Sequence, residues 1–275
     1  MTLRERQYLL EGMFTINKDV DYLYKKAKLG RLHGLLKKGN MKGLEKALDS
    51  FKTVLVSSSE LRSRAARKAN KVNPIGIRLT IGSEGSYYKP AEKVIQISLN
   101  HNAYGLLRNT GYNQSAIKDI IGTQYSRFVG EFDAENVKGT IAHELSHWLN
   151  DSLHGKAVAR TLAVVREKGV EAASGKFLTM RQHPIEIDAQ VHAVREVRRE
   201  MGKRAYDKLT WPDLFRKKNS LPGNFRDNRG QPLLPKQYND TMKRLVKRLH
   251  REGLLGKGMK RLPTYAQMLG VLKGI

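Results

Sequence analysis

Apolar and polar residues alternate over residues 75–81 of the chain, directly after a break at Asn73-Pro74. The apolar positions of this stretch are Ile75, Ile77, Leu79 and Ile81. A period of two predicts a strand with one buried face. A second apolar run predicts another strand over about residues 93–99, after a turn at Gly82 to Gly85. We therefore expect a small sheet in the first half of the chain.

Most of the remaining apolar spacing is helical. Residues 1–70 are predicted to form short basic helices broken by glycines, and one of these begins at Leu44 and continues through Leu55. One or two short helices are predicted within residues 101–130, and further helices over residues 133–150, 156–168, 184–201, 239–252 and 265–272. Prolines and glycines, which interrupt helices, recur from Trp211-Pro212 onward, so residues 216–236 should be mainly loop. The predicted fold class is α+β, mainly helical with a small antiparallel or mixed sheet.

The helix predicted over residues 133–150 has an apolar stripe with i, i+4, i+7, i+8 spacing. The stripe consists of Ile141, Leu145, Trp148 and Leu149. Asp133 and Glu135 lie near its start, where acidic side chains interact favourably with the helix dipole, and Asn150 can end it. We expect one face of this helix to be buried.

This helix carries the motif HExxH, which runs from His143 to His147. Residues four apart lie on the same face of a helix, so both imidazoles could hold one metal ion. Glu144 would project beside that ion, where a general base for a metal-activated water is needed. HExxH also occurs by chance in proteins that are not enzymes, and an ordinary helix with two histidines is the alternative.

A catalytic zinc site needs a third protein ligand. Downstream candidates are Asp151, His154, His183, Glu186, Asp188 and His192. Glu186 is favoured because the small residues Ala189 and Ala193 share its helix face and permit close helix packing. Asp188 could orient His192 from the second coordination shell, or be an ordinary surface acid.

These two segments resemble the gluzincin metallopeptidases, and most of all the minimal ImmA/IrrE-type proteins, over about residues 75–200. The resemblance implies that His143, His147 and Glu186 bind one Zn²⁺ per chain and that Glu144 is the general base. It also implies a zincin-like core whose sheet precedes the motif helix and pairs with an extended peptide through its edge strand. His192 departs from the family pattern, which has an aromatic residue there.

Two roles stay open within this resemblance. SprT-like zincins share HExxH and a basic character but use a third histidine, which here would be His183 or His192. A side-chain donor to the oxyanion could be His154, His183, His192 or Tyr206.

The charge of the chain points to anionic partners. The 275 residues include 51 Lys+Arg and 26 Asp+Glu, for a net charge of +25, and no cysteine. The absence of cysteine excludes disulfides and cysteine-ligated zinc. Such basicity favours contact with nucleic acid or another polyanion, although a solvated helix face is at least as common. Candidate phosphate-binding residues are Arg62, Arg64, Arg67, Lys68, Lys243, Arg244, Lys247 and Arg248.

The sequence thus predicts three regions: a basic helical region (1–72), a zincin-like metallopeptidase core (73–202) and a basic helical and loop region (203–275). The first residues contain no apolar signal segment, and no run is long enough to span a membrane, so we expect a cytoplasmic protein, or a virion-associated one if encoded by a phage. Two functions compete. One is a zinc metallopeptidase acting on protein or peptide substrates, and the other is a catalytically silent zincin scaffold that binds nucleic acid or forms part of a phage or mobile-element assembly.

Overall fold

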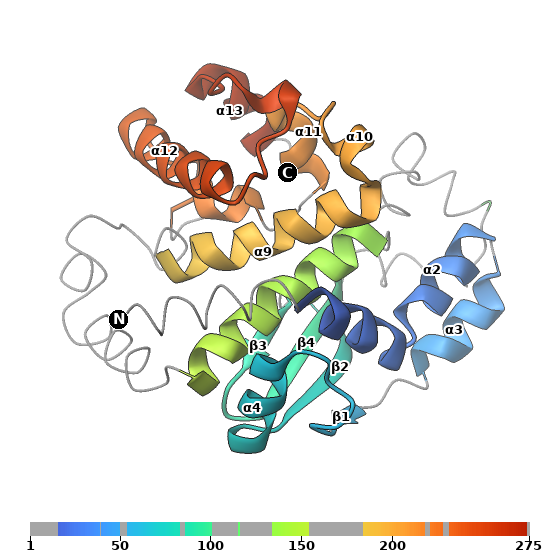
Figure 1. The fold of residues 1–275 in the computed structure, drawn as a ribbon. Coiled ribbons are helices and arrows are strands. Elements are labelled where there is room, and N and C mark those ends of the chain that lie inside the picture. Colours follow the sequence, from blue (N-terminus) through green and yellow to red (C-terminus); the bar gives the residue numbers. More distant parts are fainter. Residues whose placement is uncertain are drawn as a thin grey trace. The chain divides into compact units, whose positions relative to one another are not determined.

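The computed structural model is mainly helical with a small mixed sheet, which confirms the α+β class (Figure 1). It separates into two compact units, unit 1 (Met1–Ser152) and unit 2 (Leu153–Ile275). The residues described by the structure are 16–38, 40–49, 54–82, 86–100, 115, 134–153, 184–217, 221–227 and 231–273. The helices predicted within 101–130 and over 156–168 lie outside them, except for residue 115. The three-region division of the sequence stays a prediction.

Unit 1 contains a four-stranded sheet with the order β1-β2-β4-β3. Its strands are β1 (Val54–Val56), β2 (Ile75–Gly82), β3 (Tyr87–Lys89) and β4 (Val94–Asn100). The two central strands, β2 and β4, are parallel, and the two outer strands pair antiparallel to them. Ile77 faces Ile95 across the central pair, and both side chains are buried. The two strands predicted from apolar periodicity are therefore confirmed.

The helix predicted to continue through Leu55 is wrong. Helix α3 (Met41–Asp49) ends earlier, and Val54–Val56 forms strand β1. Val54 and Val56 are β-branched residues that pair with β2, while Leu55 points outward and is 76% exposed. The partner strand begins about twenty residues later in the chain, so local helical spacing could not reveal this pairing.

Unit 1 also contains a segment that is helical over residues 16–26, α2 (Leu29–Lys37) and α4 (Arg64–Val72). Ser63 caps α4, since its Oγ accepts a hydrogen bond of 3.0 Å from the Ala66 N–H. The buried carboxylate of Asp19 accepts a further hydrogen bond from the Ser63 N–H at 3.2 Å. Burial raises the pKa of Asp19, against the effect of these hydrogen bonds. The start of α4 is thus held by two side chains.

Unit 2 is helical in its described residues. Its elements are α9 (Pro184–Met201), α10 (Lys203–Tyr206), α11 (Trp211–Lys217), η3 (Leu221–Phe225), α12 (Pro235–Arg251), η4 (Lys257–Met259) and α13 (Tyr265–Lys273). The predictions of α9, α12 and α13 are confirmed, although α12 begins four residues early, at Pro235. Trp211-Pro212 opens a helix rather than interrupting the chain. Both corrections have one cause, since proline is favoured in the first turn of a helix.

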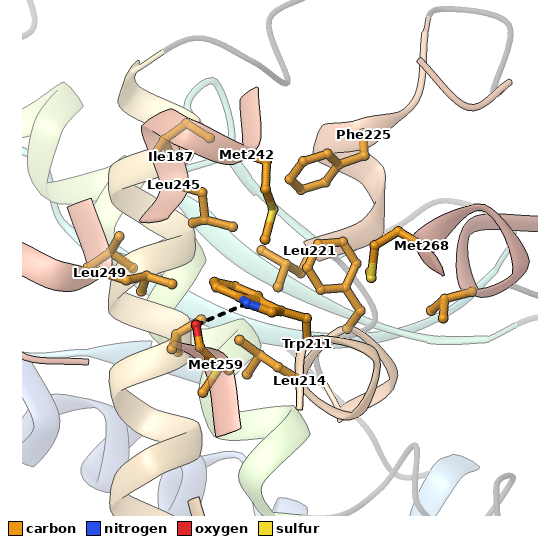
Figure 2. Close-up of a cluster of buried hydrophobic side chains, with 14 of the residues drawn as sticks. Ile187, Trp211, Leu214, Leu221, Phe225, Met242, Leu245, Leu249, Met259 and Met268 are labelled. Carbon is orange, nitrogen blue, oxygen red and sulfur yellow. Dashed lines mark hydrogen bonds between the residues drawn. The ribbon is translucent and has the colours of Figure 1, made fainter. Parts of the chain in front are cut away.

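The hydrophobic core of unit 2 packs α9, α11, α12 and α13 around a buried tryptophan, Trp211 (Figure 2). The Trp211 indole N–H donates to the carbonyl oxygens of Met259 (3.2 Å) and Arg261 (3.0 Å). Phe215 and Phe225 stack with their ring centroids 5.1 Å apart. The loop-rich segment between α11 and α12 is therefore held by aromatic packing.

Candidate metal centre

The HExxH motif lies on a helix that covers residues 134–153, nearly all of it in unit 1 (green in Figure 1). Of the predicted apolar stripe, Ile141, Leu145 and Trp148 are fully buried, whereas Leu149 is half-buried. Asn150 does not end the helix, because the helical backbone continues to residue 153. The Ser152 hydroxyl donates to the Trp148 carbonyl inside this last turn, at 2.6 Å.

The two motif histidines come together on one face of this helix. The Nε2 atoms of His143 and His147 lie 3.1 Å apart, and their rings meet edge-on with centroids 4.8 Å apart. The His143 side chain is buried, and that of His147 is half-buried. Two nitrogen donors therefore converge on one point.

Glu144 is also buried and is fixed by the sheet. Its Oε2 accepts a hydrogen bond of 2.7 Å from the main-chain N–H of Tyr88 in β3. Its Oε1 lies 4.0 Å from His143 Nε2. The carboxylate is therefore held beside the histidine pair, as expected for a base adjacent to a metal.

A polar group that the sequence did not predict joins the motif helix to the sheet. The Asn73 side-chain amide donates to Tyr88 Oη at 2.8 Å and to Ser152 Oγ at 3.1 Å. The Tyr88 hydroxyl donates to Asp151 Oδ2 at 3.0 Å, and the Trp148 indole donates to the Asn73 carbonyl at 2.9 Å. Burial raises the pKa of Tyr88 to about 12, so the phenol is protonated at neutral pH.

The third member of the candidate metal centre is Glu186, in the first turn of α9. Glu186, in unit 2, and the two histidines, in unit 1, are residue types that bind metals. These three residues could hold a metal ion, whose identity is unknown. They are the three that the sequence favoured as ligands. On the predicted face of α9, Ala189, Gln190 and Ala193 are buried.

The other candidate residues have different surroundings. Asp188 Oδ1 lies 2.7 Å from the Nε of Arg248 on α12, and burial raises the pKa of Asp188 although Arg248 opposes this. His192 is buried. The buried Tyr206 hydroxyl donates to the Leu254 carbonyl at 2.7 Å, so its proton is already engaged within unit 2. His154 and His183 lie outside the described residues.

The predicted phosphate-binding residues fall into two groups. Arg62, Arg64, Arg67 and Lys68 are exposed at or near the start of α4. On α12, Lys243 and Lys247 are exposed, whereas Arg244 and Arg248 are half-buried. Because Arg248 forms ion pairs within unit 2, with Asp188 and with Glu252, it is less suited to binding phosphate.

Comparison with known proteins finds no family model, curated protein or solved structure that matches this chain. The resemblance to gluzincins therefore depends on the motif residues themselves. Among the described residues, no helix is both long and apolar enough to cross a membrane.

Proposed function

We propose that this chain is a zinc metallopeptidase with a zincin-like core. The observation that carries the proposal is the convergence of His143 Nε2 and His147 Nε2 beside the buried carboxylate of Glu144. An exposed helix that bore HExxH by chance would not need a buried glutamate held by a neighbouring strand.

The residues present fit zinc. Two imidazole nitrogens and one carboxylate oxygen are a common ligand set for catalytic zinc, with the fourth position left for water. Zinc–nitrogen bonds of about 2.0–2.1 Å in a tetrahedral site separate two ligand nitrogens by about 3.4 Å. The separation of 3.1 Å between the two Nε2 atoms is close to that value. We propose Glu186 as the third ligand because the resemblance implies it and its carboxylate oxygen completes this ligand set.

The chain's own groups would act as follows. Bound zinc supplies an acidified water and a Lewis acid for a peptide carbonyl. Glu144 Oε1 is the acceptor for the proton of the attacking water, and it later returns that proton to the leaving amine. His143 and His147 would hold the ion, and the resemblance suggests that an extended peptide lies along β3, the outer strand next to the motif helix.

Removal of metal is expected to abolish hydrolysis. Incubation with a chelator should reduce cleavage of an unfolded protein substrate to background, and stoichiometric Zn²⁺ should restore it, because the ion is needed to acidify the water that Glu144 deprotonates. The measurement is the initial rate of appearance of new amino termini. A rate that the chelator leaves unchanged, with zinc shown to be removed, would exclude this mechanism.

A second candidate function, nucleic-acid binding, is favoured by one surface. Helix α4 buries Ala65, Ala66 and Ala69, and its exposed side chains are basic except for Val72 at its end. The chain as a whole has a net charge of +25. The exposed cations of α4 are Arg64, Arg67, Lys68 and Lys71. Their i, i+3, i+4, i+7 spacing aligns them along one side of the helix, where they could follow a phosphate backbone.

Neutralising this face should weaken binding to duplex DNA. The test variant replaces with alanine Arg64, Arg67, Lys68 and Lys71. The slope of log affinity against log salt should become shallower by about 0.9 for each phosphate that the variant no longer neutralises. The charge-matched control replaces other exposed lysines of unit 1, namely Lys18, Lys25, Lys42 and Lys46. Equal losses of affinity in both variants, or no measurable binding by the wild type at low salt, would reject a specific surface on α4.

A further inference from the structure

Tyr88 contacts the motif helix at two places, once through its main chain and once through its side chain. The main-chain N–H donates to Glu144 Oε2 at 2.7 Å, and the phenol donates to Asp151 Oδ2 at 3.0 Å. Strand β3 is the last strand of the sheet, and this N–H is directed to a side chain rather than to another strand. Tyr88 is therefore hydrogen-bonded to the motif helix and also paired with β4 in the sheet.

The two contacts are spaced along the helix. Glu144 and Asp151 are seven residues apart, which corresponds to about 10 Å of helix length. Asn73 holds the same phenol from the start of β2, at 2.8 Å, and its carbonyl accepts the Trp148 indole N–H. Because the phenol is buried and hydrogen-bonded on both sides, β3 cannot slide along the helix without breaking these bonds.

This anchoring determines where the Glu144 carboxylate points. The Tyr88 N–H occupies Oε2, and Oε1 is then the oxygen that lies 4.0 Å from His143 Nε2. Loss of that donor would leave the Glu144 carboxylate with one hydrogen bond fewer to hold its rotamer. A preorganised carboxylate needs no rearrangement when the reaction begins.

We infer that Tyr88 is a positioning residue for Glu144: its main-chain N–H orients the carboxylate, and Asn73 and Asp151 fix Tyr88 through its phenol. This inference rests on the proposed function, in which Glu144 is the base. Tyr88 has no assigned contact with the metal, and its main-chain N–H is already engaged by Glu144, so we assign its effect on the reaction to Glu144.

The contribution of the Tyr88 main-chain N–H can be isolated by comparing two variants at this position. Tyr88→Ala deletes the phenol and keeps the N–H, whereas Tyr88→Pro deletes both. Proline is tolerated on an edge strand where the N–H is not part of the ladder. We expect kcat of Tyr88→Pro to be about ten- to hundredfold below that of Tyr88→Ala, with equal KM and equal zinc content, because a hydrogen bond to a charged group is removed.

Two further variants separate positioning from general structural damage. Tyr88→Phe keeps the N–H and the ring and should lose less activity than Tyr88→Ala. Ala91→Pro introduces proline into the exposed turn that follows the same strand, away from the Glu144 contact, and its kcat should match that of the wild type. Equal kcat for Tyr88→Ala and Tyr88→Pro, or a higher kcat for the proline variant, would overturn the inference.

Amide hydrogen exchange tests the contact without relying on catalysis. The Tyr88 N–H should be protected in the wild-type protein and should exchange about tenfold faster or more in Glu144→Ala, since its acceptor is gone. Exchange of this amide at an unprotected rate in the wild type would overturn the inference. A protected amide in a protein that shows no zinc-dependent cleavage would instead contradict the proposed function and leave the Tyr88–Glu144 contact established.

Discussion

Replacing Glu144 with glutamine is expected to lower kcat for peptide hydrolysis by about 10²–10⁴-fold. Glutamine has nearly the same shape, and its amide oxygen can still accept the hydrogen bond from the Tyr88 N–H. Glutamine cannot accept a proton from the attacking water at neutral pH, so only the rate of the chemical step should fall. Steady-state kinetics on a fluorogenic peptide, with kcat and KM determined separately, would measure the effect.

The matched control for this change is Glu135→Gln. Glu135 is half-buried in the first turn of the same helix and is remote in sequence from the motif. It should retain wild-type kcat, and both variants should retain the zinc content of the wild type. If Glu144→Gln cleaves as fast as the wild type, Glu144 is not the base and the proposed mechanism is wrong.

Removing a metal ligand is expected to have the largest effect on zinc affinity. Loss of a residue that only orients a ligand typically lowers metal affinity about 10- to 100-fold. His147→Ala and Glu186→Ala should each lower the zinc affinity by more than this. Each deletes one of three protein donors. Competition titration against a zinc chelator of known affinity gives the dissociation constants.

Asp188→Ala is the control for Glu186→Ala. Asp188 lies two residues further along α9, and its carboxylate pairs with Arg248. Its removal should affect zinc affinity little and the stability of unit 2 more. Wild-type affinity in Glu186→Ala would show that the third ligand is a different residue, and the histidines His183 and His192 would become the next candidates.

Periodicity was sufficient to predict the elements that carry the metal centre. Alternation predicted β2, and helical spacing predicted both the motif helix and α9. These patterns are local, because they arise from one buried face of a single element. The spacing of His143 and His147 is also a local pattern, because residues four apart on one helix lie on the same face and bring both rings together.

Contacts between distant residues could not be predicted in this way. Tyr88 and Glu144 are 56 residues apart in the chain, and no spacing relates an edge-strand N–H to a helix carboxylate. Asn73 was interpreted only as part of a helix break, although its amide and carbonyl both bond the motif helix. Arg248 is a candidate phosphate-binding residue in the sequence because it lies on a basic helix face. Its partner Asp188 lies on another helix, 60 residues earlier, so no local pattern reveals this ion pair. Only the packed fold brings these groups together.

The zinc content of the purified protein is the most direct test of the central claim, that the HExxH helix carries an assembled zinc site. Elemental analysis of protein purified without added metal, and again after incubation with Zn²⁺ and gel filtration, should give about one zinc per chain. His147→Ala, measured in parallel, should give close to none. A wild-type protein that retains no zinc under either condition would contradict the claim and would leave the nucleic-acid-binding role of the basic surface as the function to pursue.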